Sequence, residues 1–210
     1  MKRNKGLLIL TTLLTLIPFA VGLLLWDKLP EQIPTHWNMD GEVDGWSSKN
    51  FAVFGICGFI AAIHLLCSFI TFADPKNKGH NEGTMWLMLW ICPVISAVCS
   101  AMMYFAAFGY DISVERILPI LMGGLFAVTG NYMPKFKQNS TIGIKIPWTL
   151  HDEENWTATH RFAGRIWLIG GIVIMATAFV GSVWIMLAAL IVMTVVPTVY
   201  SYRFYKKKFG

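Results

Sequence analysis

The sequence predicts an all-α integral membrane protein, built as a bundle of about six transmembrane helices. Apolar residues make up 55% of the chain and charged residues only 14%, whereas a soluble domain carries about 25% charged residues. Six apolar stretches approach the roughly 20 residues that a helix needs to cross a bilayer. None of these stretches contains Asp, Glu, Lys or Arg, as expected of helices that face lipid.

Four of the expected spans are separate apolar runs, at residues 7–26, 51–73, 85–108 and 117–133. Basic residues precede the first run, as they do in a signal peptide. The run is longer than the apolar region of a signal peptide, which has about 7–15 residues. We therefore expect this segment to stay in the protein as a membrane helix.

The last apolar block, residues 166–202, is long enough for two further spans. Gly181 and Ser182 form the expected turn between them. Each half would then have only about 18 residues, so we expect local thinning of the bilayer or anchoring by interfacial Trp side chains. The glycine pairs 123–124 and 170–171 are expected where helices pack closely.

The distribution of basic residues predicts the orientation in the membrane. With six spans and a cytoplasmic N-terminus, cytoplasmic segments carry 14 of the 17 Lys and Arg residues and outer segments carry three. This bias follows the positive-inside rule and places both termini in the cytoplasm. The cytoplasmic set is Lys2, Arg3, Lys5, Lys76, Lys78, Lys135, Lys137, Lys145, Arg161, Arg165, Arg203, Lys206, Lys207 and Lys208. The outer set is Lys28, Lys49 and Arg116.

Two connections are longer than the 2–8 residues typical of helical bundles. Residues 27–50 are expected outside and residues 134–165 inside. The chain is accordingly expected to comprise an N-terminal two-span unit, residues 1–73, and a four-span unit, residues 74–210. Because surplus loop length is often functional, these two loops are the candidate sites.

The outer loop is expected to be structured. Residues 33–37 are predicted to form a short strand, and Asp40-Gly41 and Asp44-Gly45 are predicted to be tight turns. Trp37 and Trp46 can seat the loop at the level of the lipid headgroups. Five acids and two lysines give residues 27–50 a net charge of −3, which would attract a cationic peptide from outside.

The acids of this loop also allow a metal site to be considered. Asp40, Glu42 and Asp44 resemble the start of an EF-hand, but Phe51 stands where the loop needs a bidentate Glu. A looser site that combines His36 with these acids remains an alternative. We assign no metal or cofactor to the chain.

The inner loop is predicted to lead into a helix that begins near Asp152 and continues into the fifth span. Trp156, His160, Ala163 and Trp167 share one face, which favours an amphipathic segment on the inner membrane surface. His151 and His160 are nine residues apart and would face away from each other on a helix. The region contains no HExxH or GxSxG motif.

Both loops resemble signatures of known membrane proteins. LPEQIPTHWNMDGEVDGWSSKN (29–50) is similar to the outer-loop signature of a widespread family of bacterial membrane proteins. GNYMPKFKQNSTIGIKIPWTLHDEENWTATHRFAGR (130–165) resembles the second signature of the SdpI immunity family, above all in its IGIKIPWTL core and its WTATHR segment. The order and spacing of the two motifs also agree, so the similarity covers nearly the whole chain.

The resemblance implies a multi-pass protein of the bacterial cell membrane that confers resistance to an extracellular, membrane-disrupting peptide toxin. It also implies a receptor role, in which the toxin-engaged protein recruits a cytoplasmic transcriptional repressor. The expected partners are therefore the toxin, the lipid bilayer and such a repressor, without direct contact with nucleic acid. No residue is assigned a catalytic role.

We expect the toxin to be bound by the outer loop, and the inner motif either to brace the bundle or to signal inward. The outer candidates are Pro34, His36, Trp37, Asn38, Asp40, Glu42, Asp44 and Trp46. The inner candidates are Asn139, Gly143, Lys145, Pro147, Trp148, Thr149, Trp156, Thr159, His160 and Arg161.

Two alternatives remain open from the residues alone. A transporter of small molecules or peptides is one, although transporters of ions usually place charged groups at membrane depth. The only ionisable candidate there is His64, which is expected to be a packing residue. A metal-dependent membrane hydrolase is the other, with ligands from His36 and the outer acids, or from His151, Glu153 and Glu154.

Overall fold

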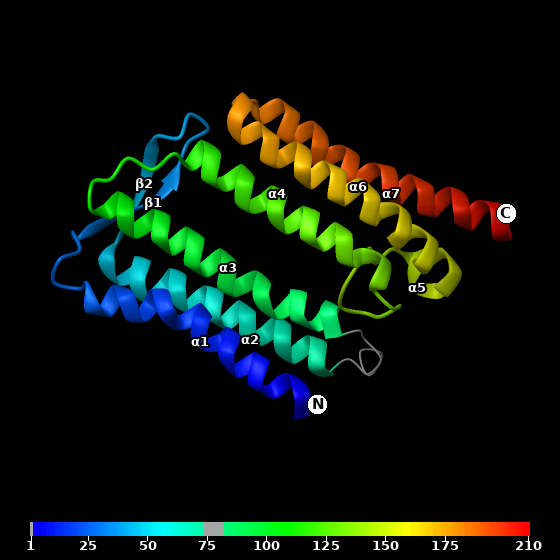
Figure 1. Cartoon of the computed structure of the whole chain (residues 1–210), viewed down its shortest axis with the longest axis horizontal. Coiled ribbons are helices and arrows are strands. Elements are labelled where there is room, and N and C mark those ends of the chain that lie inside the picture. Colours follow the sequence, from blue (N-terminus) through cyan, green and yellow to red (C-terminus); the bar gives the residue numbers. More distant parts are fainter. Residues whose placement is uncertain (1, 74–81) are drawn as a thin grey trace. The chain divides into compact units, whose positions relative to one another are not determined.

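The computed structural model describes residues 2–73 and 82–210 (Figure 1). Within these residues, six helices are long and apolar enough to cross a membrane. They are α1 (Lys2–Leu24), the π-helical η1 with α2 (Phe51–Ile56 and Cys57–Ala73), α3 (Glu82–Ala107), α4 (Val114–Tyr132), α6 (Glu153–Val180) and α7 (Val183–Phe209). The shorter elements are β1 (Gln32–Trp37), β2 (Val43–Ser48), the 3-10 turn η3 (Met133–Lys135) and α5 (Pro147–His151). The protein is therefore an all-α, multi-span membrane protein, as predicted. Lys76 and Lys78 lie outside the described residues.

The chain divides into two compact units. The first contains Met1–Ser68 and Met88–Ile117, and the second contains Phe69–Leu87 and Leu118–Gly210. This division differs from the expected boundary at residue 73, because most of the third span packs with the first unit.

Hydrogen bonds between α1 and α3 give the physical reason for this difference. The hydroxyl of Ser96 donates to the carbonyl oxygen of Thr15 at 3.0 Å, and the hydroxyl of Tyr104 donates to that of Pro18 at 2.9 Å. Tyr104 also packs in the apolar core of this unit with Leu29, Ile33, Ala52, Val53 and Met103.

His64 is a packing residue, as expected. Its side chain is buried, and its Nε2 lies 3.3 Å from the hydroxyl of Thr11, so it joins α2 to α1 in the first unit. The sequence alone could not name this partner.

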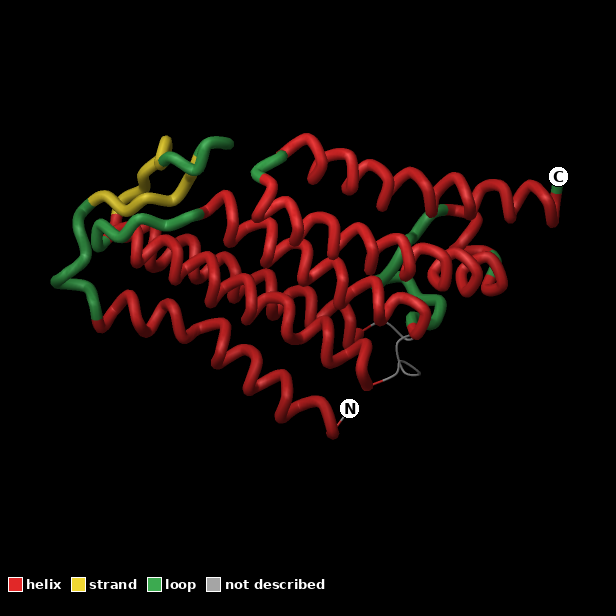
Figure 2. Tube along the Cα trace, turned by 45° about the horizontal axis from the view of Figure 1, so that its top comes forward, coloured by secondary structure: helices red, strands yellow, loops and turns green. Residues whose placement is uncertain are grey.

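The outer loop folds into an antiparallel β-hairpin, drawn in yellow in Figure 2. Gly41 at its tip has a φ of +83°, which only glycine adopts readily, so the predicted Asp40-Gly41 turn is confirmed. The predicted turn at Asp44-Gly45 is wrong, because both residues lie inside β2. Gly45 is needed there for another reason. A Cβ at this position would lie 2.8 Å from the Cβ of His36 on the facing strand.

In the second unit, glycines allow the backbones of α4 and α6 to pack closely. A methyl group at Gly123 would lie 2.5 Å from the carbonyl oxygen of Gly171, and one at Gly130 would lie 2.8 Å from that of Gly164. Close backbone approach through small residues is typical of membrane helices. The predicted close packing is confirmed at Gly123 and Gly171, and a second glycine pair extends it.

Helices α6 and α7 form a hairpin around the expected turn. Gly181 ends α6 in the left-handed conformation, with a φ of 71°, and the hydroxyl of Ser182 accepts a hydrogen bond from the N–H of Ile185 at the start of α7. The two helices have 28 and 27 residues. Each helix continues in polar sequence beyond the apolar block, so the helices are longer than their apolar halves. The expected thinning of the bilayer, or anchoring by Trp side chains, stays a prediction.

Candidate functional site

The hairpin carries an exposed His–Asp pair. Nδ1 of His36 lies 2.5 Å from Oδ1 of Asp44, and the two side chains are 72% and 44% exposed. The strand pairing shifts register on both sides of His36. The shift leaves Asp44 as an extra residue in β2, between the positions that pair with His36 and Trp37, and so brings its carboxylate beside the imidazole ring.

The hairpin tip is ordered by Asn38. Its Oδ1 accepts hydrogen bonds from the N–H groups of Asp40 at 3.0 Å and Glu42 at 2.9 Å. These bonds hold both acids at the tip with their side chains exposed. A Cβ at Gly41 would lie 2.8 Å from a carboxylate oxygen of Glu115, so a further acid is close to the tip.

The outer candidate residues fall into two groups by exposure. His36, Asp40, Glu42, Asp44 and Trp46 are exposed, and Trp46 is 56% exposed. Trp37 and Asn38 are half-buried, whereas Pro34 is buried and supports the strand instead of offering a surface. The buried Ile33 fixes the hairpin in the core of the first unit. The exposed group thus forms an acidic face on a firmly held hairpin.

No group of three or more His, Cys, Asp or Glu residues that could hold a metal occurs in the part of the chain that the structure describes. His36 and Asp44 form a pair without a third ligand of this kind. His151, Glu153 and Glu154, the alternative set of ligands, likewise form no such group among the described residues.

The inner motif is a buried network in the second unit, and Asn139 organises its first loop. Its Oδ1 accepts from the N–H groups of Thr141 at 2.7 Å and Ile142 at 2.6 Å. Its Nδ2 donates to the carbonyl oxygens of Lys137 at 2.7 Å and Ile142 at 2.9 Å. The side chain is fully buried, so these bonds satisfy a polar group that would otherwise be costly.

His160 joins this loop to α6. The N–H of Ile144 donates to His160 Nε2 at 2.9 Å, so the ring proton lies on Nδ1, which donates to the carbonyl oxygen of Trp156 at 2.8 Å. The ring is therefore neutral, with one fixed tautomer. It stacks on Trp156 at a centroid distance of 4.1 Å. Gly143, with a φ of +118°, leaves room for both rings, because a Cβ there would collide with His160 Nε2.

The face formed by Trp156, His160 and Ala163 is buried in the protein. The expectation of a helix lying on the membrane surface through this face is therefore wrong. Trp156 donates its indole N–H to the carbonyl oxygen of Phe136 at 2.8 Å. The hydrophobic spacing correctly identified the face, but the loop that packs against it could not be seen in the helix sequence.

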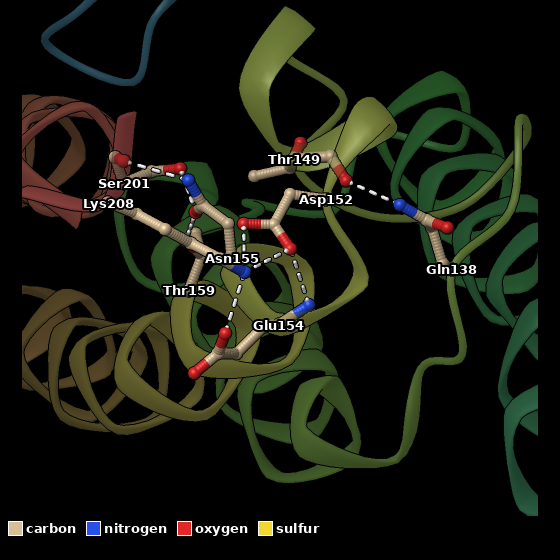
Figure 3. Close-up of polar contacts among 8 residues, drawn as sticks. All are labelled: Gln138, Thr149, Asp152, Glu154, Asn155, Thr159, Ser201 and Lys208. Atoms are coloured by element: carbon tan, nitrogen blue, oxygen red, sulfur yellow. Dashed lines mark hydrogen bonds and ion pairs between the residues drawn. The ribbon is translucent and has the colours of Figure 1, made fainter. Parts of the chain in front are cut away.

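Thr149 holds the segment before α6 in a compact conformation through local hydrogen bonds. Its hydroxyl donates to the carbonyl oxygen of Ile144 at 2.8 Å and accepts from the N–H of Ile146 at 3.1 Å. The side-chain amide of Gln138 donates to the carbonyl oxygen of Thr149 at 2.8 Å (Figure 3). The tight segment ends at Asp152, whose side chain accepts from the N–H of Glu154 and caps α6, as its predicted start requires.

Asn155 links α6 to α7, as Figure 3 shows. Its Nδ2 donates to the carbonyl oxygen of Ser201 at 3.0 Å, and its Oδ1 accepts from the hydroxyls of Ser201 at 2.7 Å and Thr159 at 2.8 Å. All three side chains are buried. Sequence reasoning included Thr159 but missed Asn155, Ser201, Gln138 and Lys208. Asn155 could have been noticed as a polar residue four positions before Thr159, on the same face.

Lys208 closes the end of this network through ion pairs. Its Nζ lies 3.0 Å from Oδ2 of Asp152 and 2.7 Å from Oε2 of Glu154 (Figure 3). Partial burial tends to raise the pKa of Asp152, but the hydrogen bonds from Lys208 and from the N–H of Glu154 outweigh it and lower that pKa below its usual value. These contacts fasten the last turn of α7 to the first turn of α6.

The remaining inner candidates lie at the surface of the network. Lys145, Pro147 and Arg161 are exposed. The ammonium of Lys145 donates to the carbonyl oxygen of Thr141 at 3.1 Å. Trp148 is half-buried, with its ring 5.5 Å from that of Tyr202. The inner motif is thus mainly a buried brace with a small exposed edge.

Comparison with known proteins gives two family matches. The model of the SdpI/YfhL protein family matches residues 135–201, which include the buried network from Asn139 to Ser201. The model of a domain of unknown function, DUF1648, matches residues 13–61, which include the hairpin. No solved structure matches the chain.

A curated relative extends the likeness to the full length. Immunity protein SdpI of Bacillus subtilis (strain 168) is 27% identical, over 100% of this chain and 99% of that protein. The family match covers the inner network, and the relative aligns from end to end. The chain is thus similar to the SdpI/YfhL protein family over residues 135–201, and to an immunity protein of that name over its full length.

Proposed function

We propose that this chain is an immunity protein of the bacterial cell membrane, which protects against a secreted antimicrobial peptide, and that the exposed face of its hairpin meets that peptide. The full-length likeness to an immunity protein supports the first part. The second part rests on one observation. A hairpin fixed by the buried Ile33 presents His36, Asp44 and Trp46 on an exposed, acidic surface.

The chemistry of this face suits a cationic, amphipathic peptide. Asp40, Glu42 and Asp44 supply negative charge that would raise the rate of encounter with a cationic ligand. Trp46 supplies exposed aromatic area of the kind that dominates binding energy at interfaces. Because the hairpin is held by core packing and by Asn38, little conformational entropy would be lost when a ligand binds.

In this proposal the hairpin faces the outside and both termini face the cytoplasm. The orientation rests on the excess of basic residues in the segments assigned to the cytoplasm. With this orientation the inner network lies on the cytoplasmic side. It acts as a structural brace, because most of its polar groups form hydrogen bonds with one another. Its exposed edge, with Lys145 and Arg161, is the surface that a repressor would contact if the chain also acts as a receptor.

The test is survival of a toxin-sensitive strain that expresses the chain, challenged with the toxin for which the Bacillus subtilis relative is the immunity protein. His36→Ala and Asp44→Asn should lose most of the protection at equal abundance in the membrane. Glu153→Gln is the matched control, because it removes one exposed carboxylate far along the chain from the hairpin. Full protection by both hairpin variants would refute the hairpin as the recognition surface.

A further inference from the structure

The first unit contains an apolar groove that the proposed function does not use. It has a volume of about 440 Å³ and is lined by Leu14 and Pro18 of α1 and by Leu25, which directly follows that helix. On the α3 side its lining includes Trp90, Ala97 and Ala101. Ala97 and Ala101 are exposed, so the groove opens at the surface of the unit. Both helices are candidate membrane spans, so the opening lies at membrane depth.

Two prolines face the groove from opposite walls. Pro18 lies inside α1 and Pro93 inside α3, and both line the groove. Proline removes a helix hydrogen bond and bends a helix at its position. The groove therefore lies beside both prolines, where each helix lacks one backbone hydrogen bond.

The length and the lining of the groove indicate which kind of ligand it can hold. Leu14 and Leu25 are eleven residues apart, which is about 16 Å along a helix, close to the roughly 15 Å of hydrocarbon in one leaflet. An extended hydrocarbon chain of about this length matches the lining, which consists mainly of apolar side chains.

We infer that this groove holds one acyl chain of a membrane lipid, as a defined binding site between α1 and α3. The site is connected to the hairpin through shared residues. Val21, Leu25 and Tyr104 line the groove, and the same residues pack with Leu29 and Ile33 beneath the hairpin. A bound chain would therefore fill space next to the base of the hairpin and support it.

The experiment uses the full chain in vesicles of phosphatidylcholine whose acyl chains carry bromine, which quenches Trp fluorescence on contact. The contribution of Trp90 is obtained by comparison with Trp90→Phe. We expect strong quenching of Trp90 in the parent, and loss of most of it in Ala97→Phe, because the added ring occupies the groove. Ala62→Phe is the matched control, since Ala62 is an exposed alanine of α2 outside the groove, and it should quench like the parent.

Native mass spectrometry of the same proteins separates a bound lipid from the surrounding bilayer. The parent and Ala62→Phe should each retain one lipid after mild detergent extraction, and Ala97→Phe should not. Equal quenching and equal lipid retention in Ala97→Phe would overturn the site, leaving only general lipid contact. A dimer of the parent that Ala97→Phe abolishes would overturn it in favour of a second copy in the groove. Neither measurement uses a toxin, so failure here is distinct from failure of the immunity proposal.

Discussion

Asn155 in α6 and Ser201 in α7 exchange hydrogen bonds in both directions. The amide nitrogen of Asn155 donates to the carbonyl oxygen of Ser201, and the hydroxyl of Ser201 donates to the amide oxygen. The two residues are 46 positions apart and are both fully buried. The pair therefore fixes the register of α7 along α6.

Removing this pair should destabilise the second unit. Asn155→Ala leaves the hydroxyls of Ser201 and Thr159 without their acceptor in a buried place, and each such group costs about 1–3 kcal/mol. Thr157→Ala, at an exposed position of the same helix, should change stability by no more than about 0.5 kcal/mol. Denaturant unfolding in detergent micelles measures both. Equal stability of the two variants would contradict a structural role for Asn155.

Adjacent glycines in α4 should respond in opposite ways to the same substitution. Gly123→Ala would place a methyl group 2.5 Å from the carbonyl oxygen of Gly171, and overpacking of this kind costs about 1–3 kcal/mol. At Gly124 the nearest atom, the sulfur of Met175, would be 4.0 Å away. Gly124→Ala should therefore be neutral, or stabilising by up to about 1 kcal/mol through helix propensity. Thermal unfolding of both variants tests this, and equal losses would argue against the close α4–α6 contact.

The ion pairs of Lys208 should make part of the stability depend on pH. The pKa of Asp152 is lowered in the folded protein, so its contribution is present above the usual carboxyl pKa of about 3.9 and is lost as the pH falls through the lower folded value. Lys208→Ala should thus be less stable than the parent at neutral pH, and the difference should shrink in acid. Lys207→Ala, another exposed lysine of α7, should not show this dependence. A difference that is constant with pH would exclude the pairing as its source.

The proposed orientation can be tested with introduced cysteines in a background lacking the four native ones. Met39 at the hairpin tip is 81% exposed, so Met39→Cys should react in intact cells with a maleimide that cannot cross membranes. Lys145→Cys, also exposed, should react only after the cells are permeabilised. The reverse pattern would invert the orientation.

The helices could be predicted because their signal is local. Apolar runs, the Gly181-Ser182 turn and the cap before α6 are each written in a few consecutive residues. The end of α7 was underestimated, since apolar length measures the membrane and not the helix. Asp44-Gly45 was wrongly predicted to be a turn. Its glycine is needed because a side chain there would collide with His36 on the facing strand. A single strand carries no mark of such a pairing.

The candidate site shows the same limit. His160 and Trp156 could be placed on one face from their spacing, but the Ile144 N–H that faces His160 lies 16 residues earlier in the chain. Sequence identified the residues of the inner motif without showing that most of them point inward. The sequence gave no indication that Ser201 belongs to this network. A single serine in an apolar helix is common, and its partner Asn155 lies 46 residues earlier in the chain.

The spacing of the α4–α6 glycines restricts how the second unit can move. Gly123 and Gly130 are seven residues apart, as are their partners Gly171 and Gly164, so the two contacts are separated by about two helical turns. A slide of one residue, about 1.5 Å, would bring side chains into both gaps at once. A relative slide of α4 and α6 is therefore blocked at both contacts, so the two helices keep a fixed register.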